Sequence, residues 1–455
     1  MKDNTQSCSE QEQIRAVPWL LASNVLSNFF CIWTFGGSIF LLFLNELGLA
    51  KGQIGMLLSL FPFCGLLALG FAPMAAHLGR KRVFILCSGL RNFVMALLLL
   101  LPLIITAAGS RVALFFLFAV IIVFALLRAI SETASCPWAQ EYVPNRLRGR
   151  LGGIGTVLST IGACIAIWLA GQAIGHWTGL TPFMVLIAAG CVLGFLSVVF
   201  MVKVPGGEPC IESETTNAHR ANMIKALKDK NFVAFLAGSG CMIFGSIIFA
   251  SFLPLYIKDH MGVPSATIVM LDSVALPGAA LSGILSGWVA DRFGSRPVLM
   301  PAMALFVLIP LGWLLLPQQT PHAVAWCAAL YILSGVASSG IGIGSSRLLS
   351  NGVIPLQRNT AYWAIQYAWS GAIGGLAVLL TGAMLTVCGG WKTRVGAMTL
   401  DGFSLLFLLA LALLAAGWCF FGRVRPDDQY TTRIVAKQLM KSVVPHRLIY
   451  NFSFK

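Results

Sequence analysis

The sequence predicts an all-α integral membrane protein with twelve transmembrane helices, arranged as two parallel six-helix repeats. Three observations lead to this prediction: the composition, the length of the apolar stretches, and an internal duplication. Hydrophobic residues make up 58% of the 455-residue chain and charged residues only 10%, whereas soluble domains carry about 25% charged residues. A soluble chain this apolar would have too few polar residues to cover its surface.

Twelve apolar stretches follow one another along the chain, each roughly 20 residues or longer, which suffices for a helix to cross a hydrocarbon core of about 30 Å. Helices satisfy their own backbone hydrogen bonds, which lipid cannot do. The predicted spans are 18–44, 53–76, 83–108, 112–139, 150–175, 180–202, 231–257, 265–290, 296–316, 322–347, 358–387 and 398–421.

The two halves of the chain resemble each other. Three pairs of segments recur in the same order at spacings of 211 to 215 residues: Leu47–Leu57 with Met261–Leu271, Gly79 with Gly294, and Tyr142–Pro144 with Val353–Pro355. Each half holds six spans, so both copies have the same orientation in the membrane. We expect an N-terminal half at 1–202, a cytoplasmic linker at 203–230, a C-terminal half at 231–422 and a basic cytoplasmic tail at 423–455.

The net charge of +15 is distributed unevenly across the membrane. An even number of spans puts both termini on one side, and 23 of the 31 Lys and Arg residues fall on that side against five on the other. This asymmetry follows the positive-inside rule and predicts a cell-membrane protein with both termini cytoplasmic. The basic residues therefore indicate contact with anionic membrane lipids, and no nucleic-acid partner is expected.

Nothing in the sequence indicates a catalytic centre. There is no Gly-rich phosphate loop that ends in Lys-Ser or Lys-Thr, so an ATP-driven pump is excluded. The twelve cysteines contain no Cys-x-x-Cys pair, which argues against a metal site. We expect no enzyme activity, no cofactor and no metal.

One loop motif is specific enough to indicate a family. The segment Leu281–Arg296 lies between two spans and contains Gly287, Asp291, Arg292, Gly294 and Arg296. This spacing resembles the signature loop of the major facilitator superfamily of membrane transporters. The first half carries a degraded copy, which keeps Gly79 and Arg80 but has Ala76 in place of the acid.

A second loop supports the same resemblance, because Glu141–Arg150 is similar to the family's loop between spans four and five. The resemblance covers essentially the whole chain. It implies two halves around a central cavity and a loop acid that helps to close the cytoplasmic side through contacts with the other half. Asp291 is the acid that remains, and we expect it to meet the basic residues of the other half. The predicted cytoplasmic gate comprises Gly79, Arg80, Gly287, Asp291, Arg292, Gly294, Arg146, Arg148 and Arg150.

Ionisable residues inside spans are rare and cost about 2.5–3.5 kcal/mol each on insertion scales, so they often mark substrate or ion pathways. Arg128 and Glu132 lie one helical turn apart in span 4, with Arg128 near the midplane. Asp272 lies in span 8, where the repeat partner is the uncharged Leu58. These three charges are the predicted substrate or coupling residues.

Two further arginines lie nearer the inner ends of their spans. Arg91 of span 3 and Arg347 of span 10 are expected to extend their long side chains to the inner headgroups.

Polar and aromatic side chains in two spans are candidates to line the cavity, because buried amides and hydroxyls need partners that lipid does not offer. They are Asn24, Asn28 and Trp33 in span 1 and Trp363, Gln366 and Tyr367 in span 11.

Together these features predict a monomeric secondary active transporter for a small solute. It would work by alternating access, with proton coupling through Glu132 or Asp272. The alternative is a membrane sensor or scaffold that has the same fold and transports nothing. Solute movement in vesicles, with and without a pH gradient, discriminates between the two.

Overall fold

The computed structural model describes residues 10–142, 148–208, 223–316, 322–354, 359–388, 391–395, 398–425 and 427. The first half contains α1 (Glu10–Thr34), α2 (Gly37–Glu46), α3 (Lys51–Leu78), α4 (Arg80–Ala96), the short η1 (Leu97–Leu100), α5 (Leu101–Ala108), α6 (Ser110–Tyr142), α7 (Arg148–His176) and α8 (Thr181–Val202). The second half contains α10 (Lys230–Ala250), α11 (Leu253–Met261), α12 (Ser265–Phe293), α13 (Arg296–Leu315), α14 (Ala323–Arg347), η3 (Leu348–Val353), α15 (Asn359–Val387) and α16 (Gly402–Arg423).

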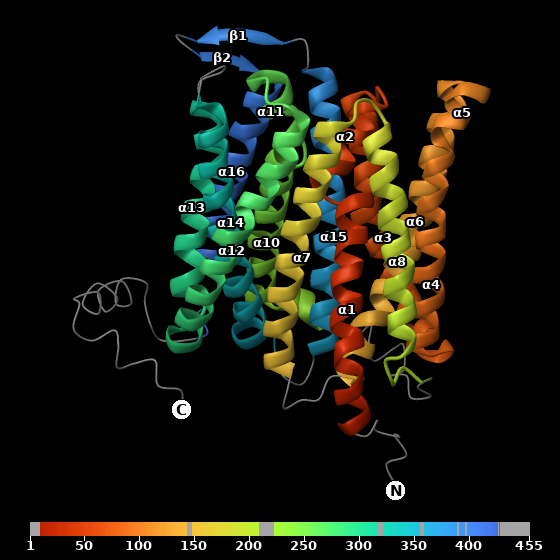
Figure 1. Cartoon of the computed structure of the whole chain (residues 1–455). Coiled ribbons are helices and arrows are strands. Elements are labelled where there is room, and N and C mark those ends of the chain that lie inside the picture. The colour runs from red at the N-terminus through yellow and green to blue at the C-terminus, as the bar shows by residue number, and fades with distance from the viewer. Residues whose placement is uncertain are drawn as a thin grey trace, which may run out of the picture.

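The helices match the predicted spans, except that residues 398–401, predicted to begin the last span, form a strand and the helix begins at Gly402. Within the described residues, eleven segments are long and apolar enough to cross a membrane, and α3, 28 residues long, coincides with the second predicted span. The helices stand side by side with their axes roughly parallel, and α1 begins at the same end of the bundle at which α16 finishes (Figure 1). The predicted all-α membrane fold is confirmed.

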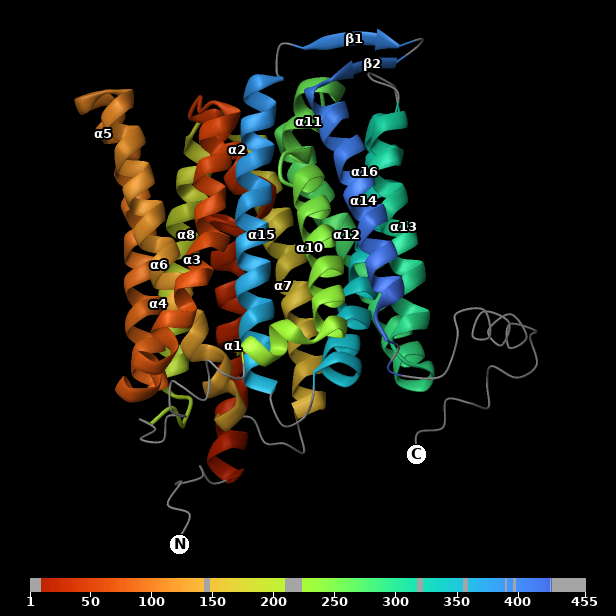
Figure 2. The same cartoon turned by 180° about the vertical axis from the view of Figure 1, so that it is seen from behind.

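The opposite end of the bundle, called the outer end below, carries an element that the sequence did not predict. Strands β1 (Lys392–Val395) and β2 (Met398–Asp401) pair antiparallel, with Lys392 opposite Asp401. This hairpin lies over the outer ends of the second half, close to α11 (Figure 2). It was missed because four-residue strands in a short loop leave no hydrophobic periodicity to detect.

Both signature loops have a glycine with a positive φ directly after the preceding helix. Gly79 ends α3 with φ at 94°, and Gly294 ends α12 with φ at 87°. Side chains rarely adopt such positive φ values, whereas glycine does so at little cost. The two framing glycines therefore hold equivalent tight turns in the two repeats.

The first span of each half is broken near its outer end. In the first half the helix stops at Thr34 and restarts at Gly37, and in the second it stops at Ala250 and restarts at Leu253. Gly36 is required at the first break, because a Cβ there would lie 2.8 Å from the Cys31 carbonyl oxygen. A break leaves backbone groups without helical partners, so both halves present polar backbone inside the membrane.

The halves pack tightly against each other at the outer end. A Cβ added to Gly55 on α3 would lie 2.8 Å from the Cα of Gly382 on α15, and one added to Gly171 on α7 would lie 2.7 Å from the Met270 side chain on α12. Small residues allow helix backbones in lipid to approach this closely. The outer entrance between the halves is therefore closed in this structure.

Candidate functional site

A cavity of about 340 Å³ lies where the two broken spans meet. The first half contributes the start of α2, and the second half contributes the α10–α11 break together with α12, α13 and α14. The lining residues are Gly37, Ser38, Leu41, Phe249, Ala250, Ser251, Leu253, Pro254, Asp272, Ala275, Trp313, Leu330, Tyr331 and Ser334.

Asp272, on α12, is the one ionisable acid among these lining residues. The Ser38 hydroxyl donates to its Oδ2 at 2.5 Å, and the Ser38 backbone N–H points at the same oxygen with N and Oδ2 3.4 Å apart. Tyr331 on α14 lines the same cavity and acts on this carboxyl. The Ser38 hydroxyl and backbone N–H of the first half therefore hold a carboxylate of the second half.

The break in the first span makes this contact possible. Because α2 restarts at Gly37, its first N–H groups have no helical partner, and the positive end of the helix dipole faces the Asp272 carboxylate. A Cβ on Gly37 would sit 3.5 Å from the Asp272 Oδ2 atom. A proton taken up by Asp272 would remove the charge that these donors bind, so the contact between the halves would weaken.

The other two predicted coupling residues belong to α6 of the first half. Glu132 faces Arg91 of α4, with Oε1 and Nη1 3.9 Å apart, and the Glu132 side chain is 48% exposed. The Arg128 guanidinium lies over the Phe35 ring, 4.9 Å from its centroid. The prediction that the Arg91 side chain extends to the inner headgroups is wrong. The residue is only 8% exposed, because its side chain turns into the helix bundle toward Glu132.

The predicted cavity residues of span 1 have different surroundings. Asn24 is exposed and lines a second cavity, between α1, α4, α6 and α8. Asn28 donates to the Ser159 carbonyl at 2.9 Å and so joins α1 to α7. Trp33 is buried and donates to the Ala166 carbonyl at 2.8 Å, which places it in the core of the first half.

The span 11 residues lie along α15. Trp363 and Tyr367 are 40% and 61% exposed. Gln366 donates to the Ser370 hydroxyl at 3.2 Å, and its own carbonyl oxygen is buried without a partner.

At the predicted cytoplasmic gate, Asp291 contacts its own half. Its Oδ1 lies 2.6 Å from Nη1 of Arg347, which also reaches Asp427 at 3.5 Å. Arg347 therefore does not extend to the headgroups as expected, because these two carboxylates hold it. The predicted partners Arg146, Arg148 and Arg150 lie outside the side chains that the structure describes.

The remaining gate residues surround the same turns. Arg292 stacks over the Trp288 ring at 5.6 Å, Arg80 begins α4, and open space lies where a Cβ on Gly287 would point.

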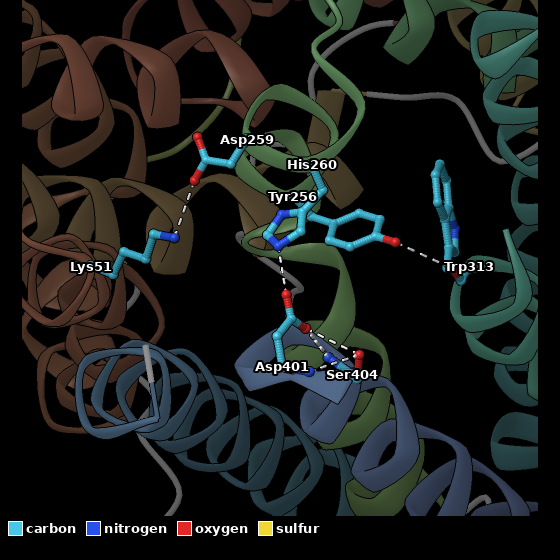
Figure 3. A network of polar contacts seen from close by, with 7 residues as sticks. All are labelled: Lys51, Tyr256, Asp259, His260, Trp313, Asp401 and Ser404. Carbon is cyan, nitrogen blue, oxygen red and sulfur yellow. Dashed lines mark hydrogen bonds and ion pairs between the residues drawn. The ribbon is translucent and has the colours of Figure 1, made fainter. Parts of the chain in front are cut away.

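A third polar cluster lies at the outer end (Figure 3). Lys51 at the start of α3 pairs with Asp259 on α11 at 3.2 Å, and Lys258 faces Glu46 at 3.9 Å. Both pairs join the two halves.

Next to these pairs, His260 Nε2 lies 2.5 Å from Asp401 Oδ2, and Asp401 Oδ1 accepts from the Ser404 backbone at 2.9 Å (Figure 3). Asp401 thus caps α16 and ties the hairpin to α11. In the part of the chain that the structure describes, no group of three or more His, Cys, Asp or Glu side chains could hold a metal ion.

Sequence reasoning missed the partners of these charges, above all Ser38, Tyr331 and Asp427. The adjacent Gly36 and Gly37 inside an apolar span were an available signal for the break beside Ser38. No local pattern marks Tyr331 or Asp427, whose roles arise from contacts across 59 and 132 residues of sequence.

Comparisons with known proteins agree with this architecture. The family model described as Major Facilitator Superfamily matches residues 21–378. The arabinose-proton symporter of Escherichia coli K12 is 25% identical over 210 residues, which cover 45% of this chain and 43% of the symporter. The cis,cis-muconate transport protein of Acinetobacter baylyi is 27% identical over 139 residues, 30% of this chain and 31% of that protein. The alignments thus span less than half of these relatives.

Solved structures show the same fold at low sequence identity. The nucleoside transporter NupG aligns with a TM-score of 0.64 at 14% identity, covering 90% of this chain and 98% of that one. A D-xylose-proton symporter aligns with a TM-score of 0.65 at 14% identity, covering 92% of this chain and 99% of that one.

Proposed function

This chain belongs to the major facilitator superfamily, and on that premise we propose that it is a secondary active transporter, which moves a small solute across the membrane by alternating access. The two halves rock against each other, and a gradient supplies the energy. The named relatives include symporters for arabinose and xylose, a nucleoside transporter and a muconate transport protein, which supports a small polar solute.

Proton coupling is assigned to Asp272 within this proposal. The observation that supports it is the contact between halves: Ser38 of the first half donates twice to the Asp272 carboxylate of the second. A proton on Asp272 weakens this contact and lets the outer entrance open, whereas release of the proton restores it. Glu132 is the weaker candidate, because its ion pair with Arg91 is long and lies within one half.

The remaining site residues are assigned by position. Arg128 and Asn24 face the interior of the first half, and Trp363 and Tyr367 present exposed rings along α15. The Asp291 loop gates the cytoplasmic side. Both termini are cytoplasmic, in accordance with the distribution of Lys and Arg.

The test is solute uptake by the full chain in proteoliposomes, with and without an inward proton gradient. L-Arabinose, D-xylose, uridine and cis,cis-muconate are the first solutes to be offered. The gradient should raise the accumulation of at least one solute several-fold. Asp272→Asn should abolish this response while exchange of the same solute across the membrane continues.

Two outcomes would contradict the proposal. If Asp272→Asn keeps its full response and Glu132→Gln loses it, the proton is carried by Glu132. If the protein binds a solute but moves none, the fold serves a sensor or scaffold instead.

A further inference from the structure

A second cavity, of about 280 Å³, lies inside the first half and is separate from the Asp272 cavity. Helices α1, α4, α6 and α8 enclose it. Among its lining residues, Asn24 and Glu132 are exposed, whereas Arg91 and Asn92 are buried. Ligand pockets measure about 300–1,000 Å³; this one lies just below that range, so only a small solute would fit.

Two residues that line this cavity each carry a buried polar atom without a hydrogen-bond partner. The atoms are Nε of Arg91, a residue 8% exposed, and Oδ1 of Asn92, a residue 1% exposed. Buried polar groups in folded proteins are nearly always hydrogen-bonded. One unsatisfied donor and one unsatisfied acceptor, on consecutive residues of the lining, indicate a place for a ligand.

Several serines of the pocket already have partners. Ser23 and Ser197 bond each other at 2.9 Å, and Ser88 bonds Ser131 at 2.7 Å. The polar groups left for a ligand are those of Arg91, Asn92, Asn24 and Ser27 and the half-exposed Glu132 carboxylate.

The charge around the pocket favours an anion. Arg91 and Glu132 both line the pocket, with Nη1 and Oε1 3.9 Å apart. Arg128, which lies outside the lining, acts on Arg91 electrostatically, so the two arginines and Glu132 together carry one positive charge in excess. One positive charge in excess is balanced by a single carboxylate, which a guanidinium binds through charge-assisted hydrogen bonds.

The Asn92 oxygen sets the second requirement, because it accepts a hydrogen bond and so needs a donor on the ligand. A hydroxyl group next to the carboxylate supplies one, and a further hydroxyl can donate to Glu132. A site built to bond a hydroxyl discriminates strongly against the analogue that lacks it. We propose that this pocket binds small hydroxylated monocarboxylates, and that they are the transported solutes.

This inference rests on the proposed transport function, but its test is equilibrium binding and needs no transport. Three linear six-carbon probes separate the two requirements: D-gluconate carries a carboxylate and hydroxyls, sorbitol carries hydroxyls alone, and hexanoate carries a carboxylate alone. Titration calorimetry on the purified full chain should show gluconate binding at least tenfold more tightly than either of the others. Equal affinity for all three would overturn the proposal.

Variants then assign the affinity to the pocket. Arg91→Gln should weaken gluconate binding tenfold or more, and Asn92→Ala should narrow the preference for gluconate over hexanoate. Arg111→Gln, an exposed arginine at the start of α6, is the matched control and should change neither. If Arg91→Gln does not fold, Arg91→Lys keeps the charge but loses the Nε donor, and it should give an intermediate affinity.

The outcomes separate the two proposals. Transport of another solute without gluconate binding overturns the substrate class alone. Tight gluconate binding that depends on Arg91, without movement of any solute, overturns the transport function and leaves the binding pocket in place; if another solute is moved instead, gluconate is not the transported solute. Unchanged gluconate binding in folded Arg91 variants overturns the assignment of the pocket.

Discussion

Ser38 in the first half donates its hydroxyl to the Asp272 carboxylate of the second half at 2.5 Å, with its backbone nitrogen 3.4 Å from the same oxygen. The bond joins the two bodies that must separate if the outer entrance is to open. It depends on the helix break at Gly36 and Gly37, which frees the backbone N–H of Ser38. The helix break at Gly36 and Gly37 therefore helps to keep the outer entrance closed, because it allows this contact between the halves.

Loss of this hydroxyl should open the outer entrance more often. A hydrogen bond to a charged group contributes about 1.5–3 kcal/mol, so Ser38→Ala should shift the equilibrium roughly tenfold to a hundredfold. The readout is the labelling rate of a cysteine in place of the cavity residue Leu41, in a chain without native cysteines and with an impermeant maleimide outside. Ser59→Ala is the control, because Ser59 bonds only a carbonyl of its own helix. Equal labelling in both variants would remove Ser38 from the gate.

Gly55→Ala should prevent the outer ends from closing. The added Cβ would lie 2.8 Å from the Gly382 Cα, and since backbone cannot yield there, α3 and α15 must separate. Pulsed EPR between labels at Ala50 and Val387 should show a longer distance than in the parent. Gly65→Ala on the same helix has open space around its Cβ and should leave the distance unchanged. A distance that does not lengthen in Gly55→Ala speaks against this closure.

Asp427 should matter more for stability than Asp291, although both contact Arg347. The Asp291 side chain is 83% exposed, and exposed ion pairs contribute about 0–1 kcal/mol. The Asp427 side chain is 3% exposed and also accepts a hydrogen bond from the Ser295 backbone N–H at 3.1 Å. Loss of the Asp427 carboxylate leaves the Ser295 N–H and the Arg347 guanidinium without this acceptor, which should lower the free energy of unfolding by about 1–3 kcal/mol. Thermal unfolding of Asp291→Asn and Asp427→Asn compares the two. A larger loss in Asp291→Asn would reverse this order.

The outer cluster should lose stability in acid. Burial raises the pKa of the Asp401 carboxyl, but hydrogen bonds from His260 and Ser404 outweigh burial and hold the pKa below its ordinary value. Asp401 precedes α16, so it lies outside the membrane-spanning helix. A lowered folded-state pKa stabilises the protein above the unfolded pKa of about 3.9, and this stabilisation disappears as the pH falls through the folded value.

The comparison for this acid effect is wild type against Asp401→Asn, which keeps an N-cap side chain but loses the charge. The wild type should melt higher at pH 7, and the difference should shrink at pH 3. A constant difference across that range would mean that the carboxylate charge contributes nothing.

The orientation follows from the charge distribution. A phosphatase that is active only outside the cytoplasm should stay silent when fused after Lys455. The same reporter inserted between β1 and β2 should be active, because the hairpin lies at the opposite end of the bundle (Figure 1). The reverse pattern would invert every loop assignment.

The sequence by itself determined the number of spans, the duplication and the loop glycines. The length of an apolar stretch identifies a membrane-spanning helix whichever helices pack beside it, because the surrounding lipid already requires an apolar helix that satisfies its own backbone hydrogen bonds. Gly79 and Gly294 were recognisable because a tight turn with positive φ requires glycine wherever the rest of the chain lies.

Only the tertiary structure decided the partners of the buried charges. The sequence singled out three charged residues by their position in a span or in the signature loop: Asp272, Arg91 and Asp291. Their partners Ser38, Glu132 and Arg347 lie on other helices, and sequence periodicity cannot show which helices pack side by side. A serine or tyrosine in a span has no distinguishing feature in the sequence; its role becomes apparent only when the fold places a carboxylate next to it. The chemistry of a membrane charge depends on which donors surround it, and packing alone determines those donors.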